Sequence, residues 1–260
     1  MGFCVKFGEN IYKNTYGYLA SEEERADDLN HMVADDSVKM ILFGGGQGAN
    51  EILPLIDYEN IKLNPKPFCS YSDGTGILNA VYSKTGLVTY YGIGAGEFRD
   101  LRYNSYTQFA AHFIEGFSAG SLRGNDSWRV LSPGVCEGVL VGGYTQNFAM
   151  HLGGEYFTYD SHQRYILFLE DHEKFSNVAA VSSYLSHIEQ HDFIKNVGGL
   201  LFGHYSETVP ADLLLRLERF GKKHRVPVVY CDDFGHGVNH SILPIGINAR
   251  LETKEMALIF

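Results

Sequence analysis

The segment Phe68-Cys69-Ser70-Tyr71-Ser72-Asp73-Gly74-Thr75-Gly76 joins a short run of strand-forming residues to a turn rich in Ser, Asp and Gly. Residues 68–71 are predicted to form a buried strand, and a helix is expected over 77–83. A serine at such a turn is lifted clear of the sheet, beside the N–H groups that begin the helix. Ser72 is therefore a candidate nucleophile, although Ser and Asp at a helix start are also ordinary capping residues.

Alternating strand-like and helix-like segments continue on both sides of this turn, which is typical of an α/β layer fold with a parallel sheet. The further predicted strands are 38–43, 87–91, 165–169, 198–202 and 226–230. The further predicted helices are 21–32, which begins with a capping box at Ser21 and Glu24, one from about 50, and 106–116, 178–190 and 211–223. Poor periodicity between about 92 and 135 predicts two α/β domains, 1–100 and 136–260, joined by a linker region, 101–135.

The composition excludes several classes of partner. The 260 residues include 31 acidic and 21 basic side chains, and the net charge of −10 comes without a run of Lys or Arg, so no nucleic-acid partner is expected. The start of the chain lacks the pattern of a signal peptide, and no stretch approaches 18 apolar residues. We therefore expect a cytoplasmic protein with no membrane partner and no cofactor.

The glycine run from Gly44 to Gly48 follows a predicted strand. A phosphate-binding P-loop requires Lys and then Ser or Thr after its last glycine, whereas Ala49-Asn50-Glu51 follows here. Two interpretations stay open: a structural turn, or a turn whose N–H groups approach a ligand closely, as donors to an oxyanion must.

Two polar clusters, residues 169–173 (LEDHE) and 232–240 (DDFGHGVNH), follow predicted buried strands, where ligands bind in open α/β sheets. Surface loops without function are the alternative. His236 and His240 are four residues apart, but Gly235 and Gly237 argue against a helix, so the zinc-binding spacing of helical histidines is missing. No metal site is predicted.

Together these segments resemble the LD-carboxypeptidase family of serine peptidases, which includes muramoyltetrapeptide carboxypeptidases and microcin-C immunity peptidases. The similar blocks occur in the family's order: 21–29 (SEEERADDL), 45–58 (GGQGANEILPLIDY), 64–73 (NPKPFCSYSD), 84–92 (KTGLVTYYG), 142–143 (GG), 166–171 (ILFLED), 235–236 (GH) and 243–246 (LPIG). Three residues depart from the family pattern, Gly44, Gln47 and Ser70, which stand where the family commonly has Arg, Tyr and Gly.

The resemblance implies a catalytic triad of Ser72, Glu170 and His236. A serine hydroxyl is a poor nucleophile until an imidazole accepts its proton, and the imidazole needs a carboxylate to fix its tautomer. By the same analogy, the N–H groups of Asp73 and of Gly45 or Gly46 would hold the oxyanion. The implied fold has an N-terminal Rossmann or flavodoxin-like parallel sheet, lacking its first βα unit, and a C-terminal α/β domain.

The implied function is that of a serine carboxypeptidase acting in peptidoglycan recycling, which removes the terminal D-Ala from a muropeptide tetrapeptide through an acyl-enzyme. One alternative is an immunity-type peptidase that cleaves an aminoacyl-nucleotide amide; in those relatives an aromatic-bearing insertion recognises adenine, and the only tryptophan here is Trp128. A third possibility is an inactive muropeptide-binding protein. The expected partner is a small peptide or muropeptide, and a homodimer is left open.

Overall fold

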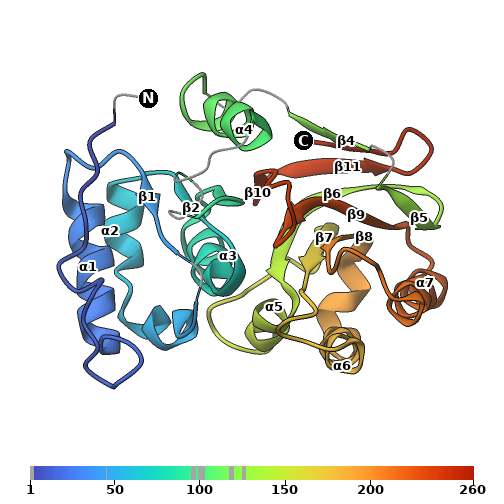
Figure 1. The fold of residues 1–260 in the computed structure, drawn as a ribbon, viewed down its shortest axis with the longest axis horizontal. Helices are drawn as coiled ribbons and strands as arrows, with labels where there is room; N and C mark the ends of the chain where they lie inside the picture. Colours follow the sequence, from blue (N-terminus) through green and yellow to red (C-terminus); the bar gives the residue numbers. More distant parts are fainter. Residues whose placement is uncertain (1–2, 45, 95–97, 99–102, 117–119, 125–126) are drawn as a thin grey trace.

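The structure is a computed structural model that describes residues 3–44, 46–94, 98, 103–116, 120–124 and 127–260. It contains two α/β parts, each built on its own sheet, which lie side by side (Figure 1). This arrangement confirms the predicted two-domain α/β fold.

The smaller sheet belongs mainly to the first 92 residues. Its strand order is β1-β2-β3-β10. The first three strands are parallel, and β10, from the C-terminal part of the chain, pairs antiparallel with β3. The strands are β1 (Ile41–Leu42), β2 (Phe68–Ser70), β3 (Thr89–Tyr91) and β10 (Leu243–Ile245), and the accompanying helices are α1 (Glu22–Ala34), the 3-10 helix η1 (Ala49–Leu55), α2 (Tyr58–Leu63) and α3 (Thr75–Thr85).

The larger sheet has the order β4-β12-β11-β6-β7-β8-β9-β5. Its central strands β6 to β9 are parallel, and antiparallel strands flank them on both sides. The strands are β4 (Ser121–Arg123), β5 (Arg129–Ser132), β6 (Val135–Tyr144), β7 (Tyr165–Glu170), β8 (Val197–His204), β9 (Val228–Gly235), β11 (Asn248–Glu252) and β12 (Ala257–Ile259); the helices are α4 (Tyr103–Phe113), α5 (Thr145–His151), α6 (Val178–Gln190) and α7 (Ala211–His224).

The parallel strands form because their side chains are apolar almost without interruption. Every residue of β7 and of β8 is buried, as expected for a parallel sheet covered on both faces. Helix α6 buries Val181, Leu185 and Ile188, which lie on one face at helical spacing. Burying one such side chain contributes about 1.5–3 kcal/mol, so packing rather than helix propensity holds α6 in place.

Helix α3 is the element that joins the two parts. Its residues 75–81 are all buried, and it contacts strands of the small sheet as well as α5 and β6. The side-chain amide of Asn79 donates to the carbonyl of Gly142 in β6 at 2.8 Å and to the carbonyl of Thr75 at 2.8 Å. One continuous apolar cluster therefore runs through both parts.

Most strong local predictions agree with the structure. The capping box at Ser21 and Glu24 is present at the start of α1, and α6 has the predicted bounds. The helix expected from about residue 50 is instead a 3-10 helix followed by the short α2, with Pro54 inside the first of them. The predicted linker includes positions outside the described residues, so the division at 100 and 135 stays a prediction.

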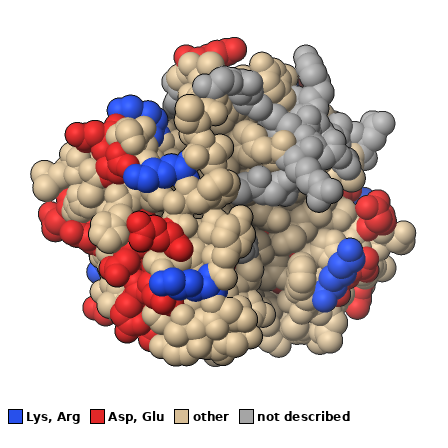
Figure 2. Space-filling view, turned by 60° about the vertical axis from the view of Figure 1, so that its left-hand side comes forward, with Lys and Arg blue, Asp and Glu red and all other residues tan. Residues whose placement is uncertain are grey.

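The surface agrees with the acidic composition. Figure 2 shows Asp and Glu side chains gathered over one side of the visible face, with only scattered Lys and Arg among the residues drawn in colour. No helix within the described ranges is both long and apolar enough to cross a membrane.

Candidate active site

Ser72 lies at the turn between β2 and α3, as the sequence predicts. It is half-buried and begins a 3-10 turn, Ser72–Gly74, that leads directly into α3. Its backbone has φ 56°, one of three non-glycine residues in the described structure with positive φ. Such a conformation costs about 1–3 kcal/mol and persists only where surrounding contacts impose it.

Glu170 and His236 form the second part of the site. Glu170 is the last residue of β7 and is fully buried, and His236 directly follows β9. The His236 Nδ1 lies 2.9 Å from both carboxylate oxygens of Glu170. Because a carboxylate only accepts hydrogen bonds, Nδ1 carries the proton, and Nε2 carries the lone pair that a general base needs.

A glycine allows this pair to form. Gly235 has φ 92°, and a Cβ atom added to it would lie 2.9 Å from Cδ, Cγ and Oε2 of Glu170. The chain therefore passes directly over the Glu170 carboxyl group before it reaches His236. Only glycine satisfies both the left-handed backbone and the close approach.

Two side chains that the sequence did not indicate bond to the backbone of Ser72, and one of them, Tyr91, links it to this pair. The Ser72 N–H donates to the Tyr91 hydroxyl at 2.9 Å, and the Tyr91 hydroxyl donates to Glu170 Oε1. On the other side of the turn, the Thr75 hydroxyl donates to the Ser72 carbonyl at 2.6 Å. The structure thus links the backbone of Ser72, through the Tyr91 hydroxyl, to the Glu170–His236 pair.

Of the predicted oxyanion donors, Asp73 lies in the same turn as Ser72. Gly45 is outside the described residues, and Gly46 has φ 132°. The side chain of Asp73 contacts the end of the glycine run, where one of its carboxylate oxygens accepts from the Ala49 N–H at 2.8 Å. The other accepts from the side-chain amide of Asn147 at 2.6 Å. Asp73 therefore fixes the end of the glycine run against the Ser72 turn.

Aromatic rings surround His236. Its ring centroid lies 5.2 Å from that of Tyr71, 5.4 Å from Tyr144, 5.5 Å from Phe175 and 5.8 Å from His172. Burial, together with the neighbouring His236 and His204, lowers the pKa of His172. The imidazole of His236 is thus held on several sides by packing as well as by its bond to Glu170.

A second buried carboxyl group lies beside the pair. Asp171 is fully buried and accepts from the Tyr144 hydroxyl at 2.7 Å and from the His172 N–H at 2.8 Å. Burial raises the pKa of Asp171 to about 6. The carboxyl group within hydrogen-bond distance of His236 Nδ1 is that of Glu170.

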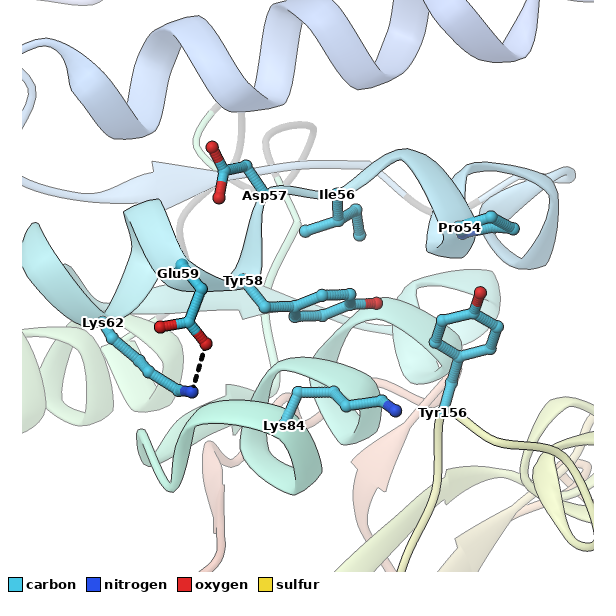
Figure 3. A pocket seen from close by; sticks show the side chains of 8 residues that line it. All are labelled: Pro54, Ile56, Asp57, Tyr58, Glu59, Lys62, Lys84 and Tyr156. Carbon is cyan, nitrogen blue, oxygen red and sulfur yellow. Dashed lines mark hydrogen bonds and ion pairs between the residues drawn. The ribbon is translucent and has the colours of Figure 1, made fainter.

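Other features of the molecule lie apart from the triad. Within the described part of the chain, no group of three or more His, Cys, Asp or Glu side chains is arranged to hold a metal ion. A cavity of about 500 Å³ lies near the opposite end of α3, where Tyr58 and Lys84 lie beside Tyr156 and Lys62 bonds Glu59 (Figure 3). A second, of about 460 Å³, lies between the N-terminal segment, α1 and β1. Neither is lined by Ser72, Glu170 or His236, but Asp73 and Gly74 of the Ser72 turn line the second.

Comparison with known proteins gives a consistent result. Family models described as the LD-carboxypeptidase N-terminal and C-terminal domains match residues 1–92 and 137–251. A putative carboxypeptidase of Treponema pallidum is 31% identical over 95% of this chain and 79% of its own. A probable murein peptide carboxypeptidase of Bacillus subtilis is 30% identical over 100% of this chain and 83% of its own.

Among solved structures, an MccF-like protein from Bacillus anthracis superposes with a TM-score of 0.81 at 27% identity, covering 93% of this chain and 81% of its own. The two matching domain models together span most of the chain, and the relatives align along nearly all of it. The chain therefore belongs to the LD-carboxypeptidase family of serine peptidases.

Proposed function

We propose that the protein is a serine carboxypeptidase that cleaves the L,D-peptide bond to the terminal D-Ala of a muropeptide tetrapeptide. The observation that carries this proposal is the buried Glu170–His236 pair joined to the left-handed Ser72 turn. Membership of the LD-carboxypeptidase family supports the proposed substrate class, and the Glu170–His236 pair provides the general base that the proposed reaction needs.

In the proposed mechanism, the Ser72 Oγ attacks the carbonyl carbon of the scissile bond while His236 Nε2 takes the hydroxyl proton. Glu170 holds the Nδ1 proton in place and stabilises the imidazolium that forms. When the tetrahedral intermediate collapses, the bond to nitrogen breaks and His236 gives its proton to the leaving amine of D-Ala. Water, activated by the same imidazole, then hydrolyses the acyl-enzyme at Ser72.

The oxyanion is assigned to the N–H groups of Asp73 and of Gly45 or Gly46. Support comes from the bond between the Asp73 carboxylate and the Ala49 N–H, because it holds the glycine run beside the turn. Backbone donors fixed in this way need no reorganisation when negative charge develops on the carbonyl oxygen.

A second candidate substrate is an aminoacyl-nucleotide amide, because solved structures of MccF, whose fold this chain shares, hold glutamyl sulfamoyl guanosine or aspartyl sulfamoyl adenosine. The environment of the sole tryptophan argues against it. Trp128 is only 6% exposed, and its indole N–H donates to the carboxylate of Asp233, so its ring is packed inside the C-terminal domain. Trp128 is therefore unavailable to stack on an adenine, and we favour the muropeptide.

The test is mass spectrometry of the protein incubated separately with a muropeptide tetrapeptide and with an aminoacyl-sulfamoyl nucleoside. We expect loss of one D-Ala residue from the first and slower or no cleavage of the second. Preferential cleavage of the nucleoside would replace the proposed substrate. Labelling of wild-type protein, but not of Ser72→Ala, by a fluorophosphonate probe would separate an enzyme from an inactive binding protein.

A further inference from the structure

The backbone of Ser72 is held from both sides by side chains that also bond to the C-terminal domain. On the N–H side, the Tyr91 hydroxyl accepts from Ser72 and donates to Glu170 at the end of β7. On the carbonyl side, the Thr75 hydroxyl donates to Ser72 and accepts from the N–H of Tyr144 at the end of β6, at 2.8 Å. Each bridge is one side chain long.

Both bridging side chains are fully buried, so water cannot replace them. Tyr91 and Thr75 are each 0% exposed. Burial, and then the neighbouring Glu170, raises the pKa of Tyr91 well above its usual value. The phenol therefore stays protonated across the working pH range, which fixes it as the donor to Glu170 and the acceptor from Ser72.

The backbone of β6 leaves room for the two bridges. A Cβ atom added to Gly143 would lie 2.4 Å from the Thr75 hydroxyl oxygen and 3.0 Å from Tyr91 Cε2. Gly143 also has φ 131°, in the region that favours glycine. Any side chain at Gly143 would therefore press directly on both bridges.

We propose that Tyr91 and Thr75 are positioning residues that hold the Ser72 turn in register with the Glu170–His236 pair. The proposal rests on the function proposed above and adds to it the means by which two domains share one triad. Contact between the domains imposes the positive φ of Ser72, since its N–H and carbonyl partners are each fixed by an element of the larger sheet. Tyr91 also withdraws charge from Glu170, and so tunes the basicity of His236.

The test compares Tyr91→Phe and Thr75→Val with two matched controls. Tyr90→Phe removes a hydroxyl from the adjacent residue of the same strand, and Thr75→Ser keeps the bridging hydroxyl. Loss of a buried bond to a charged group predicts a kcat about tenfold to a hundredfold lower for Tyr91→Phe, with KM within about twofold. Thr75→Val should also lose about tenfold or more, whereas both controls should stay within about threefold.

The pH profile distinguishes positioning from mere structural support. Without the Tyr91 donor, Glu170 holds the His236 imidazolium more strongly, so the acid limb of kcat/KM should move up by roughly half a unit to one unit in Tyr91→Phe. Thr75→Val should leave that limb in place, because Thr75 does not touch Glu170. An unchanged limb in a folded Tyr91→Phe protein, or activity close to wild type, would overturn the proposal.

A second variant avoids dependence on the folding of Tyr91→Phe. Fluorotyrosine placed at position 91 alone keeps the shape and makes the phenol a stronger donor, so the acid limb should move down; no movement would contradict the proposal. The fluorophosphonate labelling rate of each variant is measured in parallel. If the wild-type protein is labelled at Ser72 but does not cleave the tetrapeptide, only the proposed substrate is rejected. The labelling rates of the variants then still test the roles of Tyr91 and Thr75. Absence of labelling in wild type would reject both.

Discussion

Replacing Glu170 by Gln tests the assignment of the triad most directly, because the change is nearly isosteric at a fully buried site. In the wild-type protein both carboxylate oxygens lie 2.9 Å from His236 Nδ1. In the variant, an amide nitrogen facing Nδ1 would force the proton onto Nε2, which could then no longer accept the Ser72 proton. An amide oxygen facing Nδ1 would keep the tautomer but remove the charge that stabilises the imidazolium.

The magnitude follows from these two effects. A hydrogen bond to a charged group contributes about 1.5–3 kcal/mol, and the wrong tautomer adds to its loss. Loss of the orienting carboxylate in a triad of this type lowers kcat by about 10⁴, which is about 5.4 kcal/mol of transition-state stabilisation. We therefore expect kcat about 10³- to 10⁴-fold lower for Glu170→Gln. The free energy of unfolding at pH 8 should be kept, because a buried charge is removed and, with the amide oxygen in the Oε1 position, the Tyr91 hydroxyl keeps its acceptor.

The assay is D-Ala release from the tetrapeptide under single-turnover and steady-state conditions, with unfolding by urea as the check on stability. Glu173→Gln is the matched control, since Glu173 is exposed three residues away and the same charge is removed. The control should keep its rate within about twofold. A Glu170→Gln variant that retained kcat within about tenfold of wild type would refute the role assigned to Glu170.

Ser72→Ala, His236→Ala and the double variant should lose activity to a similar extent, because the triad acts as one unit; additive losses in rate assays would separate the two roles. Chelators should leave D-Ala release unchanged, whereas inhibition by EDTA that zinc reverses would instead indicate a metal bound by His236 and His240. Burial lowers the pKa of His151 to about 4. The unfolded chain therefore binds more protons between pH 6.5 and 4, and stability falls as the pH drops through that window, by up to about 3 kcal/mol. Asp171, whose pKa is raised to about 6, affects stability in the opposite sense. The free energy of unfolding in urea should therefore be compared between wild type and His151→Gln at each pH. Equal pH slopes for the two proteins would contradict the prediction.

Elements with strong local signals could be predicted from the sequence. Helix α6 has apolar residues at regular helical spacing, and β7 and β8 are continuous apolar runs, so their positions follow from burial on one face or on both. By contrast, β10 is the three-residue strand Leu243–Ile245, contains a proline and pairs with β3, which lies about 150 positions earlier in the chain. Nothing local indicates such a strand, because its partner supplies the hydrogen bonds that define it.

Strand β6 was not predicted from the sequence, for a different reason. Its residues Val135–Tyr144 include Gly138, Gly142 and Gly143, and glycine is unfavourable in strands. The structure shows what these glycines do. A Cβ atom added to Gly142 would lie 1.8 Å from the carbonyl oxygen of Phe168, and one at Gly143 would press on Thr75. Close packing of β6 against β7 and α3 therefore overrides the local preference.

The polar residues of the site also divide into those that the sequence indicates and those that it does not. Ser72, Glu170 and His236 lie at the ends of strands, where ligands bind in open α/β sheets. Their positions and residue types together therefore indicate a functional site. The sequence does not indicate Tyr91 or Thr75 in this way, because a tyrosine in a strand and a threonine at the start of a helix are ordinary core residues. Their roles depend on atoms supplied by the other domain.

This dependence supports the proposal that Ser72 from one domain and His236 from the other form a single site. The left-handed backbone of Ser72 is unfavourable by itself. Its N–H and its carbonyl each find their partner in a buried hydroxyl, and each hydroxyl is oriented by the end of a strand in the larger sheet. Separating the domains would take the Glu170 acceptor away from Tyr91 and the Tyr144 N–H donor away from Thr75, so both hydroxyls would lose the partner that orients them. We therefore expect the conformation that presents the Ser72 hydroxyl to depend on Glu170 and on the end of β6 being in place.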